Sequence, residues 1–208
     1  MADRPAVLRR GLWAAVAALS VIVVALAVRA AYEPERATGP SLGEPMGGSF
    51  ALVDQHGATV TDEELRGRPT ALFFGYTFCP DVCPVTMAEM TRWMEELGDL
   101  ADRANYVFVT VDPERDTPEV LRDYVGAFSE RIIGLSGEPE AVNTMLDSYS
   151  VKRTKVERED GHYTMDHPSW VYFLDAEWRL QGLFPFGGKQ EVAVEKLRAL
   201  IGAEETGA

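Results

Sequence analysis

The sequence predicts an α/β fold in which a central mixed sheet carries helices on both faces. Two apolar runs of the kind that form buried strands, Ala71–Phe74 and Tyr106–Val111, each lead into a segment with helix-start signals. Pro84 and Pro118 fit the first position of these helices, where the missing proline N–H costs nothing. Thr117 is a suitable N-cap for the second helix, which we expect to end near Phe128. A strand–helix–strand–helix order of this kind favours parallel strands in one sheet.

The remaining elements extend the sheet at both ends. Ser49–Val60 alternates around a Gln-His-Gly turn and predicts a β-hairpin, and Thr61 and Glu64 predict a capping box for a short helix, Asp62–Arg66. The later elements are a short apolar stretch (Ile132–Leu135), a helix from Glu138 to near Tyr149, a solvated hairpin or loop (Lys152–Gly161), two strands (Trp170–Leu174 and Leu180–Phe184) and a last helix (Val192–Ile201).

Cys79 and Cys83 are the only cysteines, and they lie at the first strand-to-helix junction. A residue before proline avoids the α region, so we expect Cys83 at the helix cap and Cys79 in the loop before it. The free N–H groups and dipole of a helix N-terminus favour thiolate over thiol. The pair therefore indicates soft-metal binding or disulfide exchange, and its position predicts a thioredoxin-like fold. Three residues separate the cysteines, one more than in thioredoxin dithiols.

Of the three histidines, His167 is the candidate for a third ligand. It directly precedes Pro168 and a buried strand, and in a thioredoxin-like sheet the loop before that strand lies beside the cysteine loop. His56 and His162 are assigned to solvated turns. Two thiolates and an imidazole suit copper or zinc, and a three-ligand site in an exported domain favours a copper carrier.

Several neighbouring residues have two interpretations. One such group is Asp112 and Arg115, with Asp116. These residues either position the ligands of the site or dock a partner, or they form local ion pairs in a polar loop. Asp166 either orients His167 by a hydrogen bond or points to solvent. A helically spaced methionine stripe, Met87, Met90 and Met94, is interpreted as the core face of its helix rather than as thioether ligands.

Composition indicates a globular domain preceded by a targeting segment. The chain has 208 residues, 46% of them hydrophobic, and a formal net charge of −13. The first 32 residues contain four arginines and one aspartate, so the rest is still more acidic. So acidic a domain is a poor candidate for binding nucleic acid or anionic lipid, and would suit a basic partner or cations.

Four segments are predicted along the chain. Residues 1–10 form a cytoplasmic N-terminus, 11–30 a transmembrane anchor, 31–48 a flexible Gly/Pro-rich linker and 49–208 the globular domain. The apolar run Gly11–Val28 would reach roughly 27 Å as a helix, just enough to cross a bilayer core. Arginines before it place the later domain on the periplasmic side of the inner membrane. A cleaved signal peptide is the alternative, and it exports the domain equally.

Three stretches resemble the Sco/SenC family of membrane-anchored copper chaperones: Gly75–Pro84 (GYTFCPDVCP), Val111–Glu119 (VDPERDTPE) and Tyr163–Leu174 (YTMDHPSWVYFL). The similarity extends from about Phe50 to Ile201 with the family's order and spacing. The resemblance implies that Cys79, Cys83 and His167 bind copper. It further implies delivery of copper to the CuA centre of cytochrome c oxidase subunit II, and in some members reduction of that subunit's cysteines. Other periplasmic copper chaperones or thiol reductants are further expected partners.

Two alternatives stay open beside copper delivery. One is a thiol–disulfide oxidoreductase with a redox-active Cys79–Cys83 disulfide, and the other is a thiol peroxidase in which Thr77 stands near a peroxidatic cysteine. Pro168 departs from the family, in which small hydroxyl residues often follow the histidine. Its position resembles the cis-proline of thioredoxins, and a cis His167–Pro168 bond would favour thiol exchange.

Overall fold

The computed structural model describes residues 13–14, 16–25 and 41–206, with side chains as far as residue 203. The chain divides into two units, Met1–Gly39 and Pro40–Ala208. In the first unit, the described residues are helical, and the rest of the expected anchor 11–30 and the expected N-terminus 1–10 lie outside the described residues. Within the part of the chain that is described, none of the helices has the length and apolar character needed to cross a membrane.

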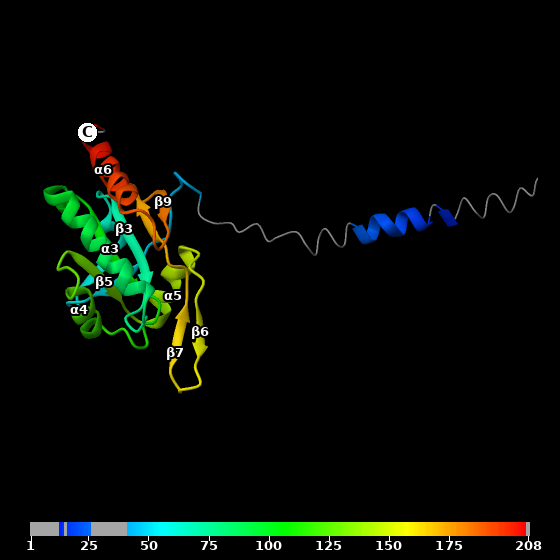
Figure 1. Cartoon of the computed structure of the whole chain (residues 1–208), viewed down its shortest axis with the longest axis horizontal. Coiled ribbons are helices and arrows are strands. Elements are labelled where there is room, and N and C mark those ends of the chain that lie inside the picture. Colours follow the sequence, from blue (N-terminus) through cyan, green and yellow to red (C-terminus); the bar gives the residue numbers. More distant parts are fainter. Residues whose placement is uncertain (1–12, 15, 26–40, 207–208) are drawn as a thin grey trace, which may run out of the picture. The chain divides into compact units, whose positions relative to one another are not determined.

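The second unit is built on a seven-stranded mixed sheet (Figure 1). In sheet order its strands are β2 (Thr59–Thr61), β1 (Ala51–Asp54), β5 (Ile132–Ser136), β4 (Asn105–Thr110), β3 (Thr70–Gly75), β8 (Val171–Leu174) and β9 (Leu180–Phe184). β3, β4 and β5 run parallel, whereas β8 pairs with β3 antiparallel. The predicted central sheet is therefore confirmed, with β3 in its interior and followed directly by the cysteine loop.

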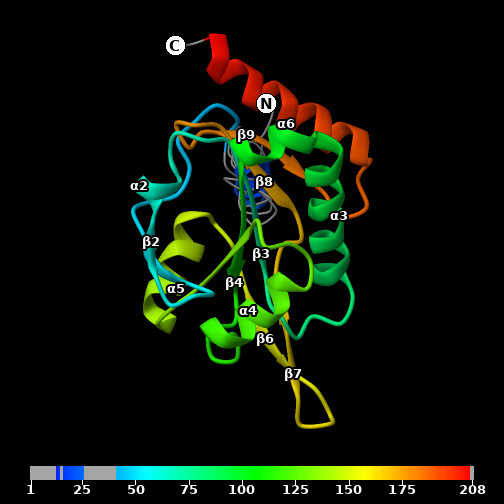
Figure 2. The same cartoon turned by 90° about the vertical axis from the view of Figure 1, so that its left-hand side faces the viewer.

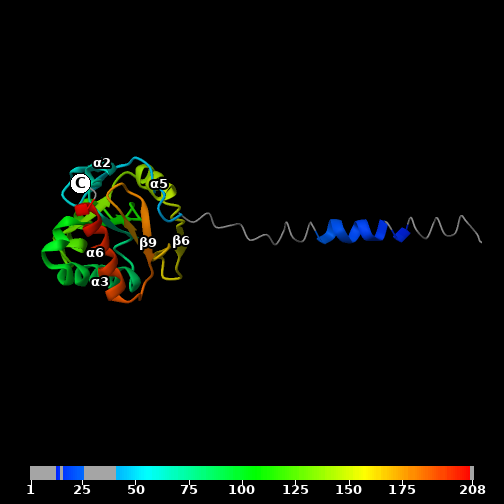
Figure 3. The ribbon, with the colours of Figure 1, turned by 90° about the horizontal axis from the view of Figure 1, so that it is seen from above.

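Helices cover both faces of this sheet. They are α2 (Asp62–Leu65), α3 (Val82–Leu97), the 3-10 helix η1 (Gly98–Arg103), α4 (Pro118–Gly126), α5 (Pro139–Ser148) and α6 (Gln190–Thr206). α3 and α6 lie together on one side of the strands and α5 lies on the other (Figures 2 and 3). The predicted cap of α4 is confirmed, because the Thr117 side chain accepts a hydrogen bond from Val120 N and Pro118 opens the helix.

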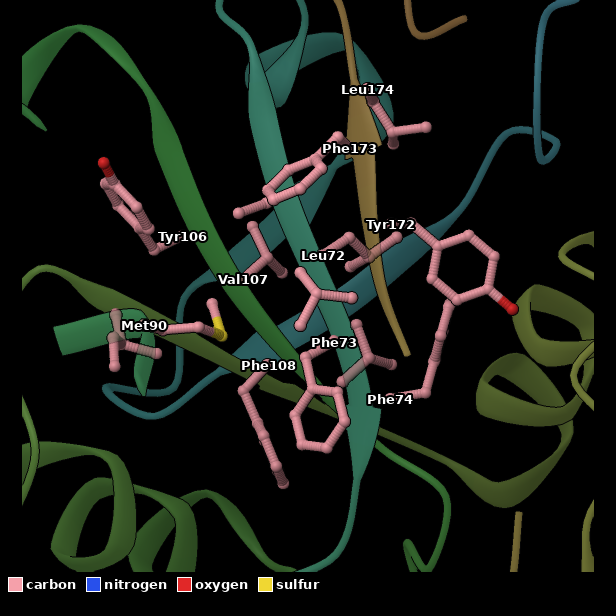
Figure 4. Packing of buried hydrophobic residues seen from close by; sticks show 14 of the residues in the cluster. Leu72, Phe73, Phe74, Met90, Tyr106, Val107, Phe108, Tyr172, Phe173 and Leu174 are labelled. Atoms are coloured by element: carbon pink, nitrogen blue, oxygen red, sulfur yellow. The ribbon is translucent and has the colours of Figure 1, made fainter. Parts of the chain in front are cut away.

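The core shows why β3 is a continuous apolar run. Successive strand residues point to opposite faces. Phe73 contacts Phe108 at a ring separation of 6.0 Å (Figure 4), on the side of the sheet where Cys83 of α3 lies. Phe74 contacts Tyr149, the residue that caps the end of α5, at 5.3 Å. A strand buried on both faces needs apolar residues at every position. The methionine stripe is also core as predicted, because Met87, Met90 and Met94 are at most 3% exposed.

The predicted N-terminal elements are confirmed. β1 and β2 pair antiparallel with Leu52 opposite Val60. Thr61 and Glu64 form both hydrogen bonds of the capping box, and α2 ends at Leu65, one residue earlier than expected.

The linker prediction differs from the structure at residues 41–48. Gly43 N donates to Leu180 O at 2.7 Å, Met46 N donates to Trp178 O at 3.0 Å, and the Met46 side chain is 5% exposed. Gly47 has a φ of +79°, and a Cβ there would lie 2.4 Å from the Tyr149 ring. These glycines are turn residues that allow close packing, although their composition resembles that of a linker.

The charged segment 152–161 belongs to a hairpin, one of its two predicted forms. β6 (Thr154–Glu157) pairs antiparallel with β7 (Tyr163–Asp166), outside the main sheet. The hairpin extends away from the main sheet (Figure 2). β7 ends one residue before His167, so this hairpin connects the histidine to the body of the domain.

Candidate metal and thiol site

The cysteine loop is a tight turn followed by the first turn of α3. Cys79 N donates to Tyr76 O at 3.3 Å. α3 begins at Val82 with Asp81 as N-cap, so the prediction that Cys83 caps the helix and Pro84 opens it is wrong. The whole first turn lacks intrahelical N–H partners, and proline is therefore tolerated two positions later than expected. Cys83 lies inside the helix and faces the core.

The two thiol groups are close, and the helix start contributes to this contact. Cys83 N donates to Cys79 Sγ at 3.4 Å, so a free N–H of the first turn is satisfied by sulfur. Cys83 is fully buried, Cys79 is partly exposed, and the two form no disulfide. Gly75, the last residue of β3, makes room for the pair, since a Cβ there would lie 3.2 Å from Cys83 Sγ.

His167, which follows Cys83 by 84 positions in the sequence, is the third member of this group. Its Nε2 lies 3.7 Å from Cys83 Sγ, and its Nδ1 lies 2.9 Å from the carbonyl oxygen of Pro168. A carbonyl only accepts, so Nδ1 carries the proton of the neutral ring and Nε2 presents a lone pair to the thiol. The ring of Tyr76 packs edge-on against the imidazole at 5.7 Å.

Cys79, Cys83 and His167 differ in their protonation because their surroundings shift the three pKa values differently. The hydrogen bond from the Cys83 thiol, together with the backbone N–H groups of Cys83 and Asp81, lowers the pKa of Cys79 to about 5, so it is a thiolate at neutral pH. The same hydrogen bond and burial raise the pKa of Cys83 well above its ordinary range, so it stays a thiol. Burial lowers the pKa of His167, which keeps the imidazole neutral. One thiolate and one neutral imidazole are ready to act as ligands.

The distance between Cys83 Sγ and His167 Nε2 would allow both atoms to bind one metal ion. Ligands with metal–sulfur bonds of about 2.3 Å and metal–nitrogen bonds of about 2.0 Å lie roughly 3.5–3.8 Å apart at tetrahedral to trigonal angles. The 3.7 Å separation of Cys83 and His167 falls in this range. Over the described residues, no three His, Cys, Asp or Glu side chains are already arranged to hold a metal. The sulfur of Cys79 is instead engaged by the helix N-terminus.

The other predicted residues take different places. His56 and His162 are exposed in hairpin turns, as expected. Asp166 is exposed, and the carbonyl of Pro168 rather than the Asp166 carboxylate lies at His167 Nδ1, so of the two interpretations of Asp166 the one in which it points to solvent is confirmed. Neighbouring residues at a strand end point in opposite directions, which explains the difference. No cis peptide bond occurs in the described chain, so His167–Pro168 is trans and the cis-proline hypothesis is wrong.

Asp112 and Arg115 form a cluster that joins the hairpin to the cysteine loop. Arg115 Nε donates to Asp112 Oδ2 at 2.5 Å, and its Nη1 donates to Tyr163 O at 3.1 Å. The guanidinium carbon lies 3.6 Å from the Tyr163 ring centroid and 4.7 Å from that of Phe78, the residue before Cys79. Tyr163 OH also donates to Asp112. Arg115 and Asp112 therefore form an ion pair that also contacts Tyr163 in the hairpin and Phe78 in the cysteine loop.

Sequence reasoning missed the place of Asp116, which it grouped with these loop charges. Its side chain is fully buried and accepts hydrogen bonds from Thr77 and Thr110. Burial raises the pKa of Asp116 against these hydrogen bonds. An acidic residue in a polar loop gives no sign of burial in a single sequence. The only available signal was its position directly before the N-cap Thr117, where the chain turns back towards the sheet.

The fold and this group of residues define a class: a thioredoxin-like domain with a CxxxC pair and a histidine facing it. The family model described as SCO1/SenC matches residues 38–202, and the chain belongs to this family.

Relatives agree with this assignment. A SCO2-like protein of Rickettsia felis is 38% identical over 133 residues, which are 63% of this chain and 65% of the relative. The chain thus spans about two thirds of that relative's length. ScoI of Bradyrhizobium japonicum, whose structure has copper bound, is 42% identical with a TM-score of 0.71, over 74% of this chain and 99% of that chain. ScoI of Arabidopsis thaliana, also with copper bound, is 31% identical with a TM-score of 0.71, over 76% and 99%. Copper is thus the metal of homologous Sco structures.

Proposed function

We propose that this chain binds one copper ion through Cys79, Cys83 and His167 and delivers it to the CuA site of cytochrome c oxidase subunit II. The observation that carries the proposal is the 3.7 Å separation of Cys83 Sγ and His167 Nε2, beside the Cys79 thiolate. The copper in the ScoI structures supports copper over zinc. Loading requires Cys83 to lose its proton and the Cys79 side chain to turn from Cys83 N towards the other two donors.

Release follows from the same arrangement. Cys79 is partly exposed, whereas Cys83 is buried, so a partner's ligands can approach the ion from the Cys79 side. Phe78 is 57% exposed and Trp170 is 41% exposed; Phe78 directly precedes Cys79 in the chain, and Trp170 lies three residues after His167. Ligand exchange with a docked subunit needs such an open side.

Copper transfer to the purified CuA domain tests delivery. The copper-loaded full-length chain is mixed anaerobically with the metal-free, reduced CuA domain, and copper in each protein is measured after separation. We expect copper to move to the CuA domain faster than free copper at the same buffered concentration supplies it. Transfer that is no faster than from the buffer would contradict delivery.

The second candidate is a thiol–disulfide oxidoreductase that reduces the CuA-site cysteines. It is favoured by one observation, a low-pKa, partly exposed Cys79 beside a buried thiol. The Cys79 thiolate would attack a partner disulfide, and Cys83, after losing its proton, would displace the partner thiol from the mixed disulfide. The partner gains two electrons, and a Cys79–Cys83 disulfide forms. His167→Ala separates the candidates, since it should abolish tight copper binding and spare this exchange.

We also propose that residues 11–30 anchor the chain in the inner membrane with the domain in the periplasm. The apolar run and the arginines before it support this orientation. Protease treatment of spheroplasts should remove the domain while residues 1–10 stay protected. Full protection of the domain would contradict the orientation.

A further inference from the structure

We propose that Asp116 is a positioning residue, whose buried carboxylate holds the turn that presents Cys79 and so sets the approach of Cys79 to Cys83. This inference concerns the same site as the proposed function, but it depends on the geometry of the apoprotein and is tested without copper.

The carboxylate holds Thr77 with both of its oxygens. Thr77 N donates to Oδ2 at 3.0 Å and Thr77 Oγ1 donates to Oδ1 at 2.6 Å. Thr77 is the second residue of the turn closed by the hydrogen bond from Cys79 N to Tyr76 O. Two bonds from one rigid group to one residue fix its orientation as well as its position. The turn that carries Cys79 is therefore attached to Asp116.

Asp116 is in turn attached to the sheet. Thr110 Oγ1, at the end of β4, donates to Asp116 Oδ2 at 2.6 Å, and Ser136 Oγ, at the end of β5, donates to the Asp116 backbone oxygen at 2.6 Å. The carboxylate is fully buried, and its bonds to Thr77 and Thr110 come from neutral donors. Burying a carboxylate against neutral donors costs folding free energy that a neutral residue would not. A buried carboxylate at position 116 is therefore better explained by its hold on the cysteine turn than by a contribution to the stability of the fold.

Disulfide formation between Cys79 and Cys83 measures how well the turn presents Cys79. In a glutathione redox buffer, the two thiols give two electrons and two protons to oxidised glutathione, which becomes two reduced molecules. The equilibrium constant reports the effective concentration of one thiol at the other. It is measured on the full-length, metal-free chain by trapping free thiols and separating the two forms.

We expect Asp116→Asn to lower this equilibrium constant about tenfold, which corresponds to about 30 mV in reduction potential. Thr77→Val, which removes one of the two bonds, should lower it less and in the same direction. Thr77→Ser keeps the hydroxyl and should restore the wild-type value. Because the two residues act through one contact, Asp116→Asn combined with Thr77→Val should cost no more than Asp116→Asn alone.

Thr70→Val is the matched control, since it removes a fully buried hydroxyl at the start of β3 whose hydrogen bonds, with Arg68 O and Asn105 Nδ2, involve neither Asp116 nor Thr77. It should lower the free energy of unfolding and leave the disulfide equilibrium unchanged. Asp116→Asn and Thr77→Val values within twofold of wild type would overturn the proposal. If Asp116→Asn does not fold, the comparison of Thr77→Val with Thr77→Ser decides. A wild-type protein that forms the disulfide but fails to bind copper would refute the proposed function and leave this inference standing.

Discussion

Cys83 Sγ and His167 Nε2 are 3.7 Å apart although 84 positions separate the two residues in the chain. One lies in the first turn of α3 and the other follows β7, and strands β3 and β8, which neighbour these segments, pair antiparallel within the sheet. The end of β3 and the start of β8 therefore lie side by side, as Val171 opposite Phe73 shows. The sheet topology itself brings thiol and imidazole together.

The low pKa of Cys79 predicts its reactivity. A thiolate reacts with iodoacetamide and a thiol does not, so the alkylation rate of the reduced, metal-free chain should rise with pH through about 5 and stay flat from about pH 6.5 to 8. One cysteine, Cys79, should react quickly and Cys83 slowly. The rate is followed by mass spectrometry across the pH series. The urea-unfolded chain is the control, with an expected midpoint of about 8.5. A folded-state midpoint at that higher value would contradict the assigned thiolate.

Gly75 should tolerate no side chain. A Cβ there would lie 2.8 Å from Phe108 and 3.2 Å from Cys83 Sγ. We expect Gly75→Ala to lower the free energy of unfolding by about 1–3 kcal/mol, as overpacking does, and to displace Cys83. Gly202→Ala is the control, because no atom lies within 4 Å of its Cβ position, and removing a helical glycine should stabilise the chain. Urea unfolding measures both variants. An unchanged free energy of unfolding for Gly75→Ala would contradict the prediction and show that the neighbouring side chains move to make room for the methyl group.

The contact between Arg115 and Asp112 predicts a stability effect. Asp112 is 3% exposed, so Arg115→Met would leave its carboxylate buried without the cation. Breaking such a pair costs about 3–5 kcal/mol when fully buried, and we expect about 2–4 kcal/mol here because Arg115 is 20% exposed. Urea unfolding at pH 7 measures the loss.

Arg115→Lys tests the geometry of this contact. It keeps the charge but not the planar group that meets Phe78 and Tyr163, so it should recover only part of the stability. Full recovery with lysine would show that charge alone matters.

Local patterns predicted most of the elements. Continuous apolar runs identified β3 and β4, and the Thr117–Pro118 pair identified the start of α4, because these signals depend on a few neighbouring residues. The placement of His167 opposite the cysteines required only the order of the strands in a thioredoxin-like sheet.

The missed features depend on contacts between distant segments. Asp116 is buried because Thr77 and Thr110 supply donors, and neither partner is identifiable from the acidic loop itself. Residues 41–48 pack on β9 although their glycines and prolines resemble a linker. α3 starts at Val82, and the side chain of its N-cap residue Asp81 makes no cap hydrogen bond, so no capping pattern marked this start.

Copper stoichiometry of the full-length chain tests the central claim most directly. The reduced protein is titrated with copper under anaerobic conditions against a competing chelator, with His167→Ala and the exposed hairpin control His162→Ala in parallel. We predict one tightly bound copper per chain for the wild type and His162→Ala, and loss of at least tenfold in affinity for His167→Ala. Equal affinity for wild type and His167→Ala would contradict the three-ligand site and leave a dithiol protein.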